Sequence, residues 1–319
     1  MAAEEGSRAG EDDLVLAATV TRRHLVAGES KVDIAADLGL SRFKVARLID
    51  QAHAAGLVRI EVEDPRGSSE RLAQQLQERL GLRHAAVVDS TGRSPTPGAV
   101  GEAAARLLCG LLDPDDVLGL PWSRGVHQMV NALQSLGMRP PPVPVVQLSG
   151  ALATGSEDSS TVDVVRRAAR VLQGGRTVFF APLVMPDADA AATLRREPSV
   201  TAALAAADTV TVAVVGVGAW SAGSSTVFDA VDATTRREVS RAGGTGEIAG
   251  RTFAAAGDLV VSPLDERLVS LSGDQLRGID EVVAIAHGPD KVEVLRAAVA
   301  GGLVTSLVTT SATAELLLG

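Results

Sequence analysis

The sequence predicts a two-domain α/β protein, with a small helical head followed by a larger, Rossmann-like α/β domain around a largely parallel sheet. Apolar residues recur at helical spacing over residues 14–54. From about Arg83 onward, short apolar strands alternate with Ala-rich helical stretches. The segment Asp64-Pro65-Arg66-Gly67 breaks regular structure between the two patterns. With 319 residues, 46% of them hydrophobic, the chain can bury a core in each part.

The head is organised around residues 30–54, whose pattern predicts two short helices joined by a tight turn. Ser30 and Asp33 form a capping-box-like start for a helix that begins at Lys31. Gly39 supplies the positive φ of the turn, and Ser41 can cap the second helix. The predicted apolar faces are Val32, Ile34, Ala35 and Leu38 in the first helix, and Phe43, Val45, Leu48, Ile49 and Ala52 in the second. A helix over residues 14–27 is expected to pack behind this pair.

Cations gather in the N-terminal half of the second helix. Arg42, Lys44 and Arg47 can face outward together, as in a recognition helix that presents its N-terminal residues to base edges while flanking cations neutralise phosphates. The alternative is an ordinary helical hairpin with a solvated basic face. The alternating segment LVRIEVED predicts a strand or wing, so residues 14–64 are expected to form a winged helix-turn-helix DNA-binding domain.

The charge of the chain limits how it can bind DNA. A formal net charge of −9 argues against a protein that coats nucleic acid non-specifically. Residues 14–62 nevertheless carry seven cations against five carboxylates, so the rest of the chain carries the acidity, which fits a small head joined to a larger acidic body. Phosphate contacts dominate the affinity of a protein for DNA. Because this head carries little net positive charge, we expect it to need a dimer or a higher assembly to hold an operator.

The other segments are assigned by composition. Residues 1–13 are predicted to be a disordered tail, residues 65–82 a linker helix, and residues 83–319 the large domain. Leu72, Leu76 and Leu80 on the linker helix suit either core packing or pairing across a dimer. Cys109 is the only cysteine, which indicates a reducing, cytoplasmic setting. The N-terminus lacks the features of a signal peptide, and no run reaches the roughly eighteen apolar residues that span a bilayer, so no membrane association is expected.

Ligand sites in such a sheet lie beyond the C-terminal ends of the strands. The predicted strands are His84 to Val88, Val117 to Leu120, Val143 to Leu148, Thr177 to Ala181, Thr209 to Val215, Glu281 to Ala286 and Thr305 to Val308. After the strand Val117 to Leu120, residues 121–125 lead into the N-terminus of a helix, a position that favours anions. Trp122 offers a flat wall for a sugar, and Arg124 could pair with a phosphate or a carboxylate. A tight strand-to-helix turn is the alternative.

Three further loops are candidates. Gly216 and Gly218 superficially resemble a dinucleotide fingerprint, but Ser221 stands at the third glycine position, and close backbone approach explains both glycines. Glu247, in the glycine-dense segment 243–253, either accepts hydrogen bonds from sugar hydroxyls or is simply solvated. Lys291 lies in a first helical turn, which is unfavourable for a cation without an anionic partner. The five histidines show no metal-ligand spacing, so neither a metal nor a cofactor is expected.

The assembled motifs resemble the SorC/DeoR-type sugar-responsive transcriptional regulators over nearly the whole chain. They are DIAADLGLSRFKVARLIDQAHAAGLVRI in the head, then GLPWSRGVHQMV, VVQLSGAL, FFAPLVM, VAVVGVG, GGTGEIAGRTF, ERLVSL and AHGPDKVEVLRAAVAGGLVTSLVTTSATAELLL, in order. The resemblance implies a large domain with the fold of ribose-phosphate isomerase and glucosamine-6-phosphate deaminase, used as a non-catalytic effector sensor in a tetramer. In one departure, Ser123 and Gly125 replace the Gly and Thr of the family's W-G-x-T phosphate loop.

The resemblance also assigns residues to two sites. The expected DNA-binding residues are Lys31, Ser41, Arg42, Lys44 and Arg47. The expected effector-binding residues are Trp122, Ser123, Arg124, Gly125, Gln147, Gly150, Gly216, Gly218, Glu247 and Lys291.

The expected protein is therefore a cytoplasmic, homotetrameric transcription factor. It binds a double-stranded DNA operator, and a sugar, polyol or sugar-phosphate effector changes its operator affinity. The alternative is an enzyme of the sugar-phosphate isomerase or deaminase class with an accessory DNA-binding head, for which Glu247 and His287 are the candidate proton-transfer pair.

Overall fold

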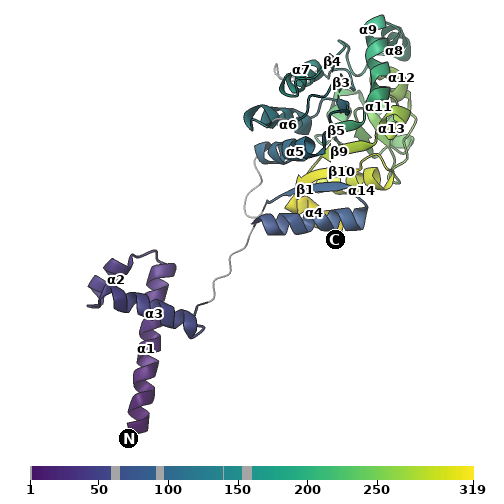
Figure 1. Cartoon of the computed structure of the whole chain (residues 1–319). Coiled ribbons are helices and arrows are strands. Elements are labelled where there is room, and N and C mark those ends of the chain that lie inside the picture. The colour runs from purple at the N-terminus through teal and green to yellow at the C-terminus, as the bar shows by residue number, and fades with distance from the viewer. Residues whose placement is uncertain (1, 59–64, 91–96, 139, 153–159) are drawn as a thin grey trace. The chain divides into compact units, whose positions relative to one another are not determined.

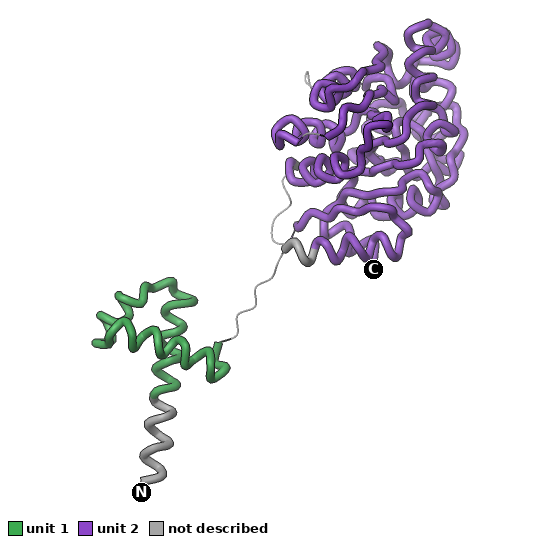
Figure 2. The backbone as a smooth tube through the Cα atoms, viewed as in Figure 1, with its two compact units in different colours: residues 1–63 green, residues 64–319 purple. Residues whose placement is uncertain are grey.

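The computed structural model describes residues 2–58, 65–90, 97–138, 140–152 and 160–319. The chain divides into two compact units, residues 1–63 and residues 64–319 (Figure 2). The division falls at the Pro- and Gly-containing segment that separates the two sequence patterns.

The first unit is helical, with α1 (Ala2–Leu25), α2 (Lys31–Asp37) and α3 (Arg42–Ala54). α1 extends through the residues for which the sequence predicts a disordered tail. Ser30 caps α2 by accepting from the backbone N–H of Asp33 at 3.2 Å, and Ser41 caps α3 by accepting from Lys44 at 3.1 Å. Between the two helices Gly39 has a φ of +65°, as the tight turn requires. Most of the predicted wing, residues 59–64, lies outside the described residues.

The core of this unit corrects two sequence predictions. The buried side chains are Ala17, Val20, Ile34, Ala35, Val45, Leu48, Ile49 and Ala52. Val32 is 62% exposed and Phe43 is 71% exposed, so the assignment of both to the apolar core face is wrong. Each precedes a buried residue by two positions, which is about 200° of rotation around a helix, and therefore points away from the core.

The second unit is built on a parallel sheet. Among its described residues, seven strands pair in the order β1-β10-β9-β5-β2-β3-β4. They are β1 (His84–Val88), β2 (Leu118–Leu120), β3 (Val145–Gln147), β4 (Arg176–Thr177), β5 (Val212–Gly216), β9 (Glu281–Ile285) and β10 (Ser306–Thr310). Each corresponds to a strand predicted from the sequence, although only β1 matches at both ends and the others are shorter or shifted by one to four residues. The predicted α/β fold with a largely parallel sheet is confirmed.

Helices cover both faces of this sheet (Figure 1). One core cluster joins it to α5 (Pro97–Leu111), α6 (Arg124–Ser135) and α7 (Thr161–Val171). The other joins it to α4 (Pro65–Leu80), α13 (Gly273–Gly278), α14 (Val292–Ala300) and α15 (Ser311–Leu318). Leu72 and Leu76 of α4 are buried in that second cluster, so the predicted linker helix packs on the large unit.

A small antiparallel sheet, which the sequence did not predict, stands beside the main one. It consists of β6 (Gly218–Ala219), β7 (Gly246–Ile248) and β8 (Arg251–Phe253) in that order. Ala249 and Gly250 join β7 to β8 with φ values of +52° and +87°, the positive φ pair of a two-residue hairpin turn. Shorter helices complete the unit: α8 (Ala188–Arg195), α9 (Pro198–Ala205), η1 (Ala206–Thr209), α10 (Thr226–Ala230), α11 (Ala233–Arg241), α12 (Pro263–Arg267) and η2 (Pro289–Lys291).

Candidate functional site

A cavity of about 500 Å³ opens where β2, β5 and β9 end. β2 and β5 are neighbours in the sheet, yet the chain leaves them toward opposite sides, β2 toward β3 and β5 toward β9. Such a switch in strand order leaves a crevice at the carboxyl ends of the strands, which is where ligands bind in open α/β sheets. The lining comes from residues 121–124, 216–218 and 223–227, with Gln128, Ser149, Leu152, Leu183, Glu247, Ala249, Ala286, His287, Asp290 and Lys291.

The segment between β2 and α6 forms one wall. Ser123 caps α6, because its hydroxyl accepts from the backbone N–H of Val126 at 3.1 Å. This N–H is therefore already bonded and is not available to an anion. Trp122 packs against the core beneath α5–α7, and its buried indole N–H has no acceptor among the described residues. Arg124 reaches across the cavity and donates to the backbone carbonyl of Gly223 at 3.3 Å.

The two glycines after β5 are required by close packing. A Cβ on Gly216 would lie 2.7 Å from the Cβ of Ser123, and one on Gly218 would lie 2.9 Å from the Cβ of Ser225. The chain then continues into β6 rather than into a helix, whereas a dinucleotide fingerprint needs a helix N-terminus directly after the glycines. The close-approach explanation therefore accounts for both residues.

Glu247 lies on β7, opposite Gly218 of β6, and its side chain is buried at the cavity wall. One carboxylate oxygen accepts from the Ser225 hydroxyl at 2.9 Å, and the other accepts from the backbone N–H of Gly250 at 3.0 Å. Burial raises the pKa of this carboxyl above its ordinary value, against the opposing effects of these hydrogen bonds and of Lys291. The glycine-dense segment 243–253 forms the β7–β8 hairpin rather than a loop, and the burial of Glu247 excludes the solvated alternative.

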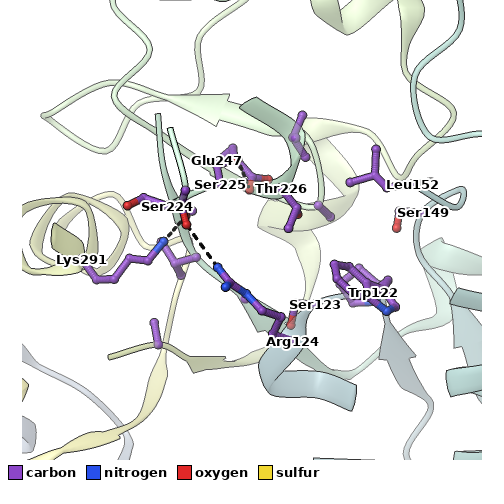
Figure 3. Close-up of a pocket in the computed structure, with 18 of the residues that line it drawn as sticks. Trp122, Ser123, Arg124, Ser149, Leu152, Ser224, Ser225, Thr226, Glu247 and Lys291 are labelled. Atoms are coloured by element: carbon purple, nitrogen blue, oxygen red, sulfur yellow. Dashed lines mark hydrogen bonds between the residues drawn. The ribbon is translucent and has the colours of Figure 1, made fainter. Parts of the chain in front are cut away.

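Lys291 and Arg124 both reach the segment that carries Ser224 (Figure 3). Its ammonium donates to the backbone carbonyl of Ser224, and the Ser224 hydroxyl donates to the carboxylate of Asp290. Burial lowers the pKa of Lys291, while the negative charges of Asp290 and Glu247 oppose this shift. Burial, assisted by the positive charge of Arg124, also lowers the pKa of His287. The cavity therefore presents two cations, a buried carboxyl and several hydroxyls.

The structure brings seven of the ten predicted effector residues to this cavity: Trp122, Ser123, Arg124, Gly216, Gly218, Glu247 and Lys291. The other three do not line it. A Cβ on Gly125 would lie 2.7 Å from the Ile285 side chain, and one on Gly150 would lie 2.6 Å from the Pro182 backbone, so both glycines serve packing. The buried amide of Gln147 donates to the carbonyls of Ser149 and Phe179 and accepts from the N–H of Phe179, which ties β3 to the chain beyond β4.

Sequence reasoning missed the segment from Gly223 to Val227, which forms the opposite wall. Its only local signal is Ser225, which caps α10 by accepting from Phe228 at 3.1 Å. His287 appeared only in the enzyme alternative, and Asp290 was not predicted, although both line the cavity.

In the head, the predicted DNA-binding residues lie at the starts of two helices. Lys31, Arg42 and Arg47 are exposed and Lys44 is half-buried, while the Ser41 hydroxyl is used as the cap of α3. The first turn of α3 carries no acidic residue. The exposed start of this helix is therefore positive, as its sequence predicts.

Two features are absent from the described residues. No three His, Cys, Asp or Glu side chains among them are grouped so as to hold a metal ion. No helix in the described part of the chain is long and apolar enough to cross a membrane.

Comparison with known proteins gives a consistent result. Residues 65–319 match the Sugar-bind family, described as "Putative sugar-binding domain". The transcriptional regulator LsrR of Escherichia coli K12 is 29% identical over 297 residues, which cover 91% of this chain and 90% of LsrR. LsrR of Enterobacter sp. strain 638 is 28% identical and covers 99% of this chain and 97% of its own.

Solved structures show the same fold. The full-length sorbitol operon regulator SorC from Klebsiella pneumoniae aligns with a TM-score of 0.73 at 24% identity, covering 96% of this chain and 99% of SorC. A DeoR family transcriptional regulator from Listeria monocytogenes aligns with a TM-score of 0.70 at 24% identity, covering 78% of this chain and 99% of its own. Because the family match takes in well over half of its residues, the chain belongs to the Sugar-bind family, whose model describes a putative sugar-binding domain.

Proposed function

We propose that this protein is a cytoplasmic, non-enzymatic transcriptional regulator that binds a double-stranded operator through its head. A sugar, polyol or sugar phosphate bound in the large unit changes its operator affinity. The observation that carries the proposal is the cavity at the ends of β2, β5 and β9, which lies within the matched sugar-binding domain and gathers both acidic and basic side chains.

The cavity offers the groups that a polyhydroxy ligand needs. Glu247 can accept from hydroxyls, while Lys291 and Arg124 can donate to hydroxyl oxygens or to an anionic group. In the present structure both cations donate to backbone carbonyls of the segment 223–224. A ligand that takes over these donors would release that segment, which links occupation of the cavity to a change in the surrounding chain.

The head supplies the DNA contact. In this proposal α3 enters the major groove, Arg42 and Arg47 contact bases or phosphates, and Lys31 and Lys44 contact the backbone. The similar proteins LsrR and SorC are a transcriptional regulator and a sorbitol operon regulator, which favours this function over the enzyme alternative.

Coupling between the units is assigned in this proposal to an assembly of several copies of the chain. An effector changes DNA affinity only if it binds the two quaternary states with different free energies. We propose a homotetramer, in which several weakly charged heads act together on one operator and a shift in their spacing lowers the combined affinity.

Two measurements on the full-length protein test the proposal. Gel shifts with its native upstream region should show sequence-preferring binding, and thermal-shift screening of sugars, polyols and their phosphates should identify a stabilising ligand. Absence of sequence preference at every salt concentration, with and without those ligands, contradicts the regulator function. Turnover of sugar phosphates by the purified protein would instead support the enzyme, for which Glu247 and His287 line the same cavity.

A further inference from the structure

Phe43 is a large apolar side chain that the core of the head does not use. It is 71% exposed in the first turn of α3, on the opposite side of the helix from Val45, Leu48, Ile49 and Ala52. A solvent-exposed phenyl ring at this position gains nothing from the packing of its own domain.

The ring lies within a positively charged surface. Arg42 precedes it, Arg47 follows one turn later on the same exposed side, and the first turn of α3 contains no acid. The Arg42 guanidinium lies 4.8 Å from the ring centroid, a cation–π contact that keeps the cation beside the ring. The surface thus consists of one apolar group with cations on both sides, which is complementary to a polyanion that contains an apolar feature.

Duplex DNA has such a feature in its major groove. Of the base edges exposed there, only thymine carries a methyl group, and phenylalanine is among the side chains that contact it. We propose that Phe43 packs against a thymine methyl group in each half-site of the operator, and that this contact makes the protein prefer thymine at that position. The inference rests on the proposed function, since it takes α3 as the recognition helix.

The test removes the methyl group without disturbing base pairing. Duplexes are first selected from a random library with the full-length protein, and each thymine of the recovered site is then replaced by deoxyuridine, one position at a time in both half-sites. The wild-type protein should lose about fourfold in affinity per half-site at one thymine, the effect of one buried methyl group. Phe43→Ala should bind the parent duplex more weakly and be indifferent to deoxyuridine at that position.

Two variants test whether the lower DNA affinity of Phe43→Ala has a cause other than the lost thymine contact. Phe43→Leu keeps an apolar side chain and should retain part of the deoxyuridine effect. Val26→Ala removes another exposed apolar side chain of the head, 81% exposed and outside α3, and should leave binding unchanged. Thermal unfolding of Phe43→Ala should match the wild type, because the ring is not part of the core.

The outcomes separate this inference from the proposed function. Two results would overturn the thymine contact alone. In the first, the wild-type protein selects a site but its affinity changes at no deoxyuridine substitution. In the second, Phe43→Ala loses as much affinity on deoxyuridine substitution as the wild type does. A change in oligomeric state of Phe43→Ala, measured by sedimentation, would assign the ring to a contact between copies and also overturn it. A wild-type protein that selects no sequence overturns the regulator function itself.

Discussion

At the scale of single residues, Lys291 is the cation most committed to the cavity. Its stem is partly buried and its ammonium holds the Ser224 carbonyl. The sequence predicts that Lys291 lies in a first helical turn and has a partner other than solvent. The structure places it one position earlier, at the end of η2 and directly before α14. In the structure that partner is the backbone carbonyl of Ser224.

We expect Lys291→Met to weaken effector binding at least about tenfold, because a hydrogen bond from a charged donor is lost. Methionine keeps the length of the stem, so the fold should persist. The measurement is the concentration of the sugar identified by screening that gives half of its maximal thermal shift. Lys31→Met, in the head, is the control, and an unchanged titration of Lys291→Met would remove Lys291 from the site.

Glu247 should make stability depend on pH. Burial raises its pKa, so the folded chain holds the proton more tightly than the unfolded chain does. Its contribution to stability is therefore fully present below the ordinary pKa of 4.5 and is lost as the pH rises through the raised value.

Glu247→Gln removes this dependence. We expect the urea midpoint of the variant to rise relative to the wild type between pH 4 and neutrality, and the exposed Glu102→Gln to show no such trend. A difference between Glu247→Gln and wild type that does not change with pH would contradict the assigned effect of burial. The same variant should also weaken effector binding, since it loses the charged acceptor.

At the scale of elements, the end of β5 and the start of α6 are in unusually close contact. Gly216 leaves room for Ser123, whose hydroxyl caps α6. This contact brings Trp122 and Arg124 to the cavity wall. It also occupies the helix N-terminus with a side chain, where the family's W-G-x-T loop has a glycine.

We expect Gly216→Ala to destabilise the protein by about 1–3 kcal/mol, as overpacking of a close contact does. Ser123→Gly alone should cost only a few tenths of a kcal/mol, because glycine is tolerated as an N-cap. The double variant should be more stable than Gly216→Ala alone, since the new methyl group would replace the lost side chain. Denaturant unfolding of the four proteins measures the coupling, and simple additivity would show that the two residues are not in steric conflict.

At the scale of the whole molecule, the division into two units predicts that their functions can be separated. Arg42→Ala with Arg47→Ala should abolish sequence-preferring binding, because both exposed cations of the proposed recognition helix are lost. The effector-induced thermal shift should remain. Arg237→Ala with Arg277→Ala makes the same change of charge on exposed positions of the large unit and should leave DNA binding intact. Loss of effector affinity in the head variant would refute the division.

The proposed tetramer makes a further prediction. If weak heads act together, operator affinity should fall when the protein is diluted below its assembly concentration. Sedimentation and gel shifts over the same concentration range check this. A monomer that binds the operator with undiminished affinity would contradict the proposal.

The sequence by itself determined the order of the seven strands of the main sheet, the two units, the caps of α2 and α3, and most of the chain segments around the cavity. These features depend on local periodicity, on hydroxyl and glycine positions, and on motifs that occur in order. Tertiary structure decided which side chains meet. It paired β6 with the β7–β8 hairpin and so buried Glu247, and it placed Gly223–Val227 opposite Trp122, because the sheet order joins strands that are distant in the chain.

The dependence on contacts between distant segments also explains where the sequence predictions and the structure differ. Hydrophobicity alone assigned Phe43 to the core, whereas the packing of α1 against α3 fixed which side of the helix is buried. Motif position placed Gly125, Gln147 and Gly150 among the expected effector residues, but they do not line the cavity, and their packing and hydrogen bonds serve the framework behind it. Local sequence determines what a segment can form, while long-range contacts determine which of its faces is left for function.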